Sequence, residues 1–72
     1  PTSGTNMQII VNGEPIEIAD DISMSGLIQH LDLTGKRLAV EVNEELVPRS
    51  RFAHHTLARD DRVEIIHAVG GG

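Results

Sequence analysis

The chain has 72 residues, with eleven acidic against six basic side chains and a net charge of −5 when its four histidines are neutral. This size allows one domain, and the absence of cysteine excludes a disulfide framework and a thiolate metal site. The acidic balance argues against a nucleic-acid partner, because phosphates are bound by Lys and Arg. It favours a partner with a basic surface.

Neither a membrane span nor a leader is evident. No apolar run is long enough to cross a bilayer, and no basic segment followed by an apolar run resembles a signal peptide. We therefore expect a cytoplasmic protein without a membrane partner. Residues 1–6 lack apolar side chains and precede Met7, so we interpret them as a disordered lead-in or a leftover of the expression vector.

The first half of the chain predicts a β-hairpin followed by a helix. Residues 7–11 and 14–18 are rich in β-branched side chains, and Asn12-Gly13 between them favours a two-residue hairpin turn. Ser23 is a typical helix N-cap. An apolar stripe with helical spacing follows it, and Thr34-Gly35 ends the segment after a helix that stops near Asp32. The stripe consists of Met24, Leu27, Ile28 and Leu31.

The second half predicts three more strands. Residues 38–42 form a nearly apolar strand, and residues 46–47 form a brief one that ends at Pro48. Residues 49–57 lack a period and suggest an irregular turn of helix. The last strand is expected over residues 62–69.

The order β-β-α-β-β-β predicts an α+β domain over residues 7–69, in which one helix crosses a small mixed sheet. This plan is a β-grasp, with the last strand beside the first in the middle of the sheet. Alternation along the strands and the helix stripe predict a shared core. Its expected members are Met7, Ile9, Val11, Ile16, Ile18, Leu27, Ile28, Leu31, Val40, Val42, Val63 and Ile65.

The same alternation predicts an apolar patch on the outer side of the sheet. If Val63 and Ile65 point inward, then Ile66 and Ala68 point outward, and so does Ile10 on the neighbouring strand. Exposed apolar patches on small domains often mark partner sites. We expect these residues to form a partner interface, with Glu64 adding attraction towards a basic surface.

Conventional catalytic and metal sites have little support. Ser50, His54 and Asp60 could be combined into a hydrolase triad, but such combinations arise by chance in most chains. His54-His55 has no evident third ligand, so we expect no metal site. Gly35-Lys36 lacks the spacing of a phosphate-binding loop. The sequence therefore predicts no catalytic residue in this chain.

The chain ends in Gly70-Gly71-Gly72. Glycines without Cβ atoms can enter a slot that any side chain would block, so we expect residues 70–72 to be a flexible tail whose Gly70 and Gly71 thread into another protein's active site. The carboxylate of Gly72 is a poor electrophile until it is activated, most simply as an acyl-adenylate. Because nothing in the chain suggests an ATP site, a separate enzyme would supply it, and this chain would bind no cofactor.

Residues 7–72 resemble the ThiS family of sulfur carriers, which have the ubiquitin-like β-grasp fold. The resemblance rests on Met7–Gly13, Leu38–Asn43, Val47-Pro48-Arg49 and Asp61–Gly72. Two positions depart from the family pattern, Gly26 in the helix and Asp60 before the last strand. The resemblance implies that Gly72 is adenylated by an E1-like (ThiF-like) enzyme and becomes a thiocarboxylate. It also implies that this thiocarboxylate donates sulfur to a ThiG-like thiazole synthase in thiamine biosynthesis.

Several other readings stay open on the sequence. A small subunit like that of molybdopterin synthase would share the fold and the tail but serve another acceptor. A ubiquitin-like tag is disfavoured because Lys36 is the only lysine. An RNA-binding β-grasp domain is opposed by the acidic balance, and a non-catalytic interaction module would use no terminal chemistry.

Overall fold

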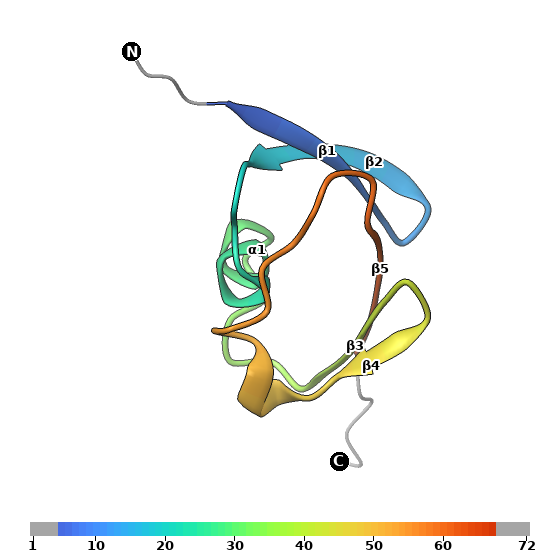
Figure 1. The fold of residues 1–72 in the computed structure, drawn as a ribbon. Coiled ribbons are helices and arrows are strands. Elements are labelled where there is room, and N and C mark those ends of the chain that lie inside the picture. Colours follow the sequence, from blue (N-terminus) through green and yellow to red (C-terminus); the bar gives the residue numbers. More distant parts are fainter. Residues whose placement is uncertain (1–4, 68–72) are drawn as a thin grey trace.

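The computed structural model describes residues 5–67, which form a five-stranded sheet, one α-helix and a short 3-10 helix, as Figure 1 shows. The elements follow the predicted order. They are β1 (Asn6–Val11), β2 (Glu14–Ala19), α1 (Met24–His30), β3 (Leu38–Val42), β4 (Glu45–Val47), η1 (Arg49–Arg51) and β5 (Arg62–His67).

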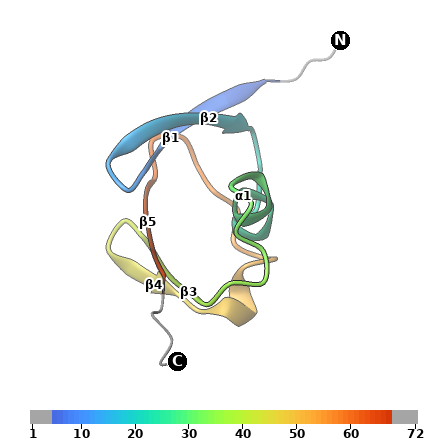
Figure 2. The same cartoon turned by 180° about the vertical axis from the view of Figure 1, so that it is seen from behind.

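The sheet has the strand order β2-β1-β5-β3-β4, which places β5 at its centre. β1 and β5 run parallel, whereas the β1–β2, β3–β5 and β3–β4 pairs are antiparallel. The views in Figure 1 and Figure 2 show α1 facing the concave side of this curved sheet. The predicted β-grasp arrangement is confirmed, including the position of the last strand beside the first.

Both hairpins turn through residues with positive φ. Asn12 and Gly13 have φ values of 50° and 84°, as the Asn-Gly pair predicts, and join Val11 to Glu14. Asn43 and Glu44 have φ values of 52° and 72° and join β3 to β4. Two consecutive positive φ angles match the right-handed twist of the strands that they connect. The second hairpin thus uses the same turn without a glycine.

The helix begins and ends with local caps. The Ser23 hydroxyl accepts a hydrogen bond from the Gly26 N–H at 3.1 Å, which confirms the predicted N-cap. At the other end Asp32 has φ 61°, its N–H donates to Gln29, and the Leu33 N–H donates to the carbonyl of Ile28. This is the pattern of a Schellman cap, with Asp32 in the place that glycine usually takes. The helix therefore stops at His30.

Gly26 has a packing reason in the helix. A Cβ atom at this position would lie 2.7 Å from Cγ1 and 3.3 Å from Cδ1 of Ile22. Ile22 is half-buried against the core and precedes the helix. The Ile22 side chain thus packs so close to the backbone of α1 that a Cβ atom at position 26 would force it to move.

Nine of the twelve predicted core residues are buried, and three are only partly covered. These three, Val11, Ile16 and Leu31, line an open hollow of about 450 Å³ beside the sheet, because the short helix stops before it covers them. The buried core gains Met24, Val47 and Leu57, which the prediction omitted. The remaining members are Met7, Ile9, Ile18, Leu27, Ile28, Val40, Val42, Val63 and Ile65.

The first strand begins at Asn6, so the predicted lead-in over residues 1–6 is one residue too long. Asn6 pairs with Ala19, and the Thr5 carbonyl accepts a hydrogen bond from the Asp20 N–H at 3.1 Å. The expected continuation of the last strand to Val69 lies outside the described residues. Between residues 5 and 67, no helix combines the length and apolar character needed to span a bilayer.

Candidate functional site on the outer sheet face and the last strand

The candidate site begins with β5, the strand that precedes the C-terminal glycines in the sequence. β5 pairs with β3 over five of its six residues, from Val42 opposite Val63 to Leu38 opposite His67. The last described residue is therefore level with the first residue of β3. Because β3 holds β5 up to His67, the position from which the chain continues is fixed.

On its other side β5 is held by a short pairing with β1 and by one asparagine side chain. Strand pairing with β1 covers only two residue pairs, which end at Val11 and Val63. The Asn12 side chain then continues the ladder: its Oδ1 accepts from the Ile65 N–H at 2.9 Å, and its Nδ2 donates to the Ile65 carbonyl at 3.2 Å. The turn residue of the first hairpin thus replaces a strand where β1 has already turned away.

A second asparagine fixes the start of β5. The Asn43 Oδ1 accepts from the Arg62 N–H at 3.0 Å, and its Nδ2 donates to the Asp61 carboxylate at 3.0 Å. The other oxygen of Asp61 accepts from the Ala58 N–H at 2.8 Å. The turns of both hairpins therefore hold the same strand. The rigid placement of β5 follows from these contacts as well as from the sheet.

The side of the sheet opposite α1 carries the predicted interface residues. Val63 and Ile65 are buried, whereas Glu64 is exposed and Ile66 keeps 54% of its surface exposed. Ile10 also lies on this side, but it is half-buried. The outward orientation of Glu64 and Ile66 follows the alternation that the sequence analysis used.

Ile10 does not join Ile66 in one apolar patch, and here the prediction is wrong in detail. Ile10 pairs with Arg62 at the start of β5. Ile66 follows four residues later, about 13 Å further along an extended strand. Ile10, Arg62 and Glu64 instead line a shallow hollow of their own. The parallel register of β1 and β5 causes this separation, and no local pattern in the sequence reveals that register.

Three residues of this face were missed. Leu46 is 66% exposed, Ala39 pairs with Ile66, and Glu41 lies between Leu46 and Glu64 in the register of three strands. Leu46 was missed because β4 has only three residues, so its alternation with the inward-facing Val47 is a weak signal. We call the set the outer sheet face, which consists of Ile10, Ala39, Glu41, Leu46, Glu64 and Ile66.

The outer sheet face combines apolar and acidic groups, and Arg62 adds one cation on the same side, beside Ile10 and Glu64. Glu41 and Glu64 lie directly opposite each other on neighbouring strands. Like charges in such positions destabilise a sheet, and a cation placed between them would relieve the repulsion. Leu46 and Ile66, the two large exposed hydrophobic residues of the described part, flank this acidic pair. The face therefore suits a partner that presents a basic side chain beside apolar ones.

The remaining predicted site residues are Ala68, Gly70, Gly71 and Gly72. All four lie outside the described residues. Their expected roles in partner contact, in threading and as the reactive terminus therefore stay predictions.

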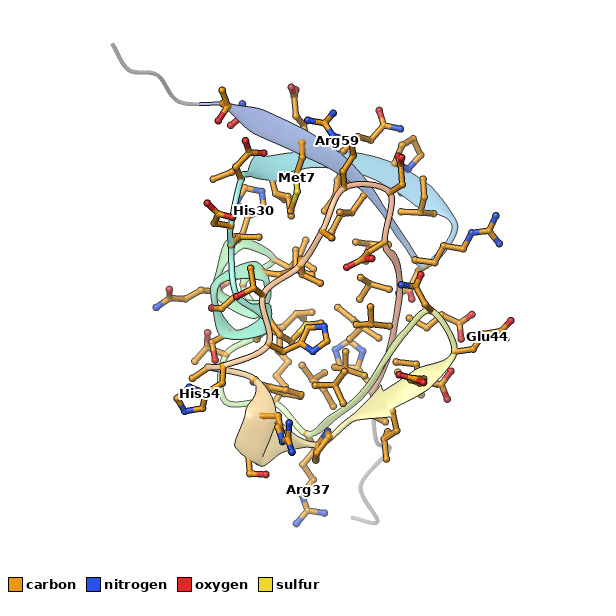
Figure 3. The ribbon with its side chains drawn as sticks, in the orientation of Figure 1. Met7, His30, Arg37, Glu44, His54 and Arg59 are labelled. Atoms are coloured by element: carbon orange, nitrogen blue, oxygen red, sulfur yellow. The ribbon has the colours of Figure 1, made fainter. Side chains whose placement is uncertain are left out.

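The histidines and the triad candidates do not assemble into a site. Within residues 5–67, no group of three or more His, Cys, Asp or Glu side chains could hold a metal ion. His30 and His54 are both exposed, and Figure 3 shows His54 projecting from the surface. Asp60 donates its N–H to Gln8 in β1. Asp60 is thus held beside β1, whereas Ser50 lies in η1.

Comparisons with known proteins agree with this geometry. A sequence model of the ThiS family matches residues 9–72. The chain is 43% identical to protein ycf40 of Porphyra purpurea over 68 residues. These residues make up 93% of this chain and 94% of that protein. It is 27% identical over 66 residues to the sulfur carrier protein ThiS of Escherichia coli strain K12, covering 92% of this chain and 100% of the relative.

One relative and one solved structure add further information. The thiazole synthase of Magnetococcus marinus is 35% identical over 66 residues, which span 92% of this chain but only 20% of that protein. The crystal structure of the thiamine biosynthesis protein ThiS from Geobacter metallireducens matches with a TM-score of 0.80 at 30% identity. The match covers 92% of this chain and 100% of that one.

Proposed function

Because the chain belongs to the ThiS family, we propose that it is a sulfur carrier of thiamine biosynthesis whose reactive group is the C-terminal carboxylate of Gly72. An E1-like adenylating enzyme uses ATP to form the acyl-adenylate and releases pyrophosphate. Hydrosulfide, whose sulfur derives from cysteine, then attacks the carbonyl carbon and displaces AMP, so that a C–S bond replaces the activated C–O bond. The resulting thiocarboxylate donates its sulfur during thiazole formation.

The observation that carries the proposal is the extent of the family match. It runs from residue 9 to residue 72 and therefore includes all three terminal glycines as well as the folded domain. In the proposal this chain contributes no catalytic residue and binds no cofactor, because the activating enzyme holds ATP. The carrier shares the cytoplasm with that enzyme.

The fixed position of β5 supports this role, because the tail follows β5 in the sequence. β5 is held by β3 on one side and by the Asn12 side chain on the other. Glycines beyond such a strand have free backbone angles and no side chains. A narrow channel could thus admit the terminus and exclude water from the acyl-adenylate, while the folded domain stays outside.

Thiazole synthase is the proposed sulfur acceptor. One fifth of the thiazole synthase of Magnetococcus marinus is similar to nearly all of this chain, and the thiazole synthase of Paramagnetospirillum magneticum shows the same relation at 32% identity. A carrier-like region within the synthase chain supports a direct partnership between the two functions. It also favours thiamine biosynthesis over a molybdopterin acceptor.

The outer sheet face is the proposed docking surface for the activating enzyme. Leu46 and Ile66 supply apolar contact area, and the pair Glu41 and Glu64 attracts a basic side chain. The face borders β5 along its length, so an enzyme that holds it also lies close to His67, which the terminal residues follow in the sequence.

A loading assay tests the chemistry. The chain is incubated with its adenylating enzyme, ATP and a sulfur donor, and intact mass should show one oxygen exchanged for sulfur at the C-terminus. Gly71→Val adds a branched side chain and removes access to positive φ. It should abolish ATP–pyrophosphate exchange without loss of stability, and deletion of Gly72 should do the same by shortening the reach.

Glu17→Val is the matched control, because it places the same side chain at an exposed position of β2. It should leave loading unchanged. Exchange at the parent rate in either tail variant would contradict the carrier mechanism.

A further inference from the structure

A second surface feature lies at the helix layer, away from the outer sheet face. An open groove of about 320 Å³ is lined by α1, by the turn that follows it and by η1. Its floor is apolar, with Ile28 buried and the other three residues half-buried. The floor consists of Ile28, Leu33, Leu38 and Phe52, and the rim carries the exposed cations Lys36 and Arg49.

Local contacts hold the groove in shape. The Ser25 N–H at the start of α1 donates to the Phe52 carbonyl at 3.0 Å, which ties η1 to the helix. The Lys36 N–H donates to the Leu33 carbonyl at 3.2 Å across a turn in which Gly35 has φ 86°. The two cations therefore project from backbone segments that are fixed to the same helix.

The charge of the groove is opposite to that of the chain. None of the residues that line it is acidic, although the chain has eleven acidic and only six basic side chains. Both rim cations have exposed ends, and Lys36 is the only lysine. An acidic protein with a localised positive groove attracts negative charge at that place. The apolar floor beneath the cations adds a requirement for an apolar side chain.

The groove also lies near the end of the last strand. Leu38, which forms part of its floor, pairs with His67, the last described residue. Arg37, labelled in Figure 3, stands between Lys36 and Leu38 in the sequence and adds a further exposed cation, which projects into solvent. A protein that takes up the C-terminus can therefore reach the groove at the same time.

We infer that this groove is a docking site for a segment of the thiazole synthase in which an apolar side chain lies next to an Asp or Glu carboxylate. The inference rests on the proposed function for the identity of the partner. The apolar side chain covers Phe52 and Leu38, and the carboxylate lies between Lys36 and Arg49. A small molecule fits less well, because ligand pockets enclose most of their ligand, whereas this groove is open.

In this proposal the activating enzyme binds the outer sheet face and the thiazole synthase binds the groove. The outer sheet face lies on the side of the sheet that α1 does not cover, whereas the groove is formed by α1 itself. Because both partners take up the same terminus, they bind one after the other, each on its own surface. The synthase thus recognises features of the carrier that the activating enzyme does not need.

Titration calorimetry with the purified thiazole synthase tests the inference. Lys36→Glu and Arg49→Glu should each weaken binding by about tenfold or more and should reduce its dependence on salt. Arg59→Glu is the matched control, because it makes the same charge change at an exposed arginine near Met7, remote from the groove (Figure 3). Its affinity should stay within about twofold of the parent, and circular dichroism should show all three variants folded.

Equal affinities of the Arg49 and Arg59 variants would overturn the inference. So would tighter binding by both groove variants, which would mean that the groove holds the carrier's own C-terminus and competes with the synthase. Loading of the parent chain is measured separately by pyrophosphate exchange. Normal loading with unchanged synthase affinity of the groove variants refutes the groove alone, whereas absent loading refutes the proposed function.

Discussion

Replacing Asn12 with glycine isolates the two hydrogen bonds by which the first hairpin holds β5. The Asn12 side chain accepts from the Ile65 N–H at 2.9 Å and donates to the Ile65 carbonyl at 3.2 Å, across 53 positions of sequence. Glycine removes both bonds. It also accepts the φ of 50° at this position without strain. Backbone strain therefore adds nothing to the measured loss of stability.

The expected loss follows from the number of bonds. A typical intramolecular hydrogen bond contributes about 0.5–1.5 kcal/mol net, so two bonds in a partly buried place contribute about 1–3 kcal/mol. For a domain of this size each kcal/mol lowers the melting temperature by about 4–8 °C. The extra freedom of glycine in the unfolded chain adds to the loss by about 0.5–1 kcal/mol.

Far-UV circular dichroism is the suitable assay, because the chain has no Trp or Tyr for fluorescence. Urea titrations should show a lower midpoint with an unchanged slope. Amide exchange gives the specific signature: the Ile65 N–H should lose protection, since its acceptor is gone. Glu44→Gly is the control, because Glu44 also has positive φ in a hairpin turn. It should cost nothing or stabilise by up to about 1 kcal/mol.

A loss below about 0.5 kcal/mol for Asn12→Gly, the lower end for one hydrogen bond, together with normal protection of Ile65, would refute the reasoning. It would mean that pairing with β3 alone holds the last strand.

Three further predictions concern the core, the helix and the outer sheet face. Leu27→Ala should destabilise by about 2–5 kcal/mol, because Leu27 is fully buried; a change within the noise of a urea titration would mean that the helix stripe does not support the core. Gly26→Ala gains about 1 kcal/mol of helix propensity but costs about 1–3 kcal/mol through its clash with Ile22, so a net loss is expected. The same change should become stabilising in an Ile22→Ala background, and identical effects in both backgrounds would exclude the clash. Ile66→Asp should leave the melting temperature nearly unchanged, since the side chain is exposed, but weaken binding of the activating enzyme; equal affinities in a calorimetric titration would remove the outer sheet face from the mechanism.

The elements that the sequence determined by itself are those whose cause lies within a few residues. Asn12-Gly13 predicts its hairpin because both residues tolerate positive φ, and Ser23 predicts the helix start because its hydroxyl reaches Gly26. Alternation along β5 predicts that Glu64 and Ile66 face outward. The terminal glycines are likewise visible without any structure, and the proposed chemistry at Gly72 depends on them.

The core illustrates the limit of such patterns. Leu57 lies in a segment without a period; its N–H donates to the Ile22 carbonyl, which fixes this segment beside the entry to α1, and its side chain is buried in the core. Val47 belongs to a strand too short for alternation to be convincing, yet it is buried opposite Val40. In both cases the position of a distant segment, rather than the local sequence, decides which side chain is covered.

Only the tertiary structure decided which surface residues lie together. The parallel register of β1 and β5 separates Ile10 from Ile66, and the antiparallel register of β3 brings Glu41 opposite Glu64. The groove needs α1, the turn after it and η1 at once, so neither Lys36 nor Arg49 suggests it alone. Local conformation depends on neighbours in the chain, whereas strand register and layer packing depend on contacts between segments far apart, which no window of the sequence contains.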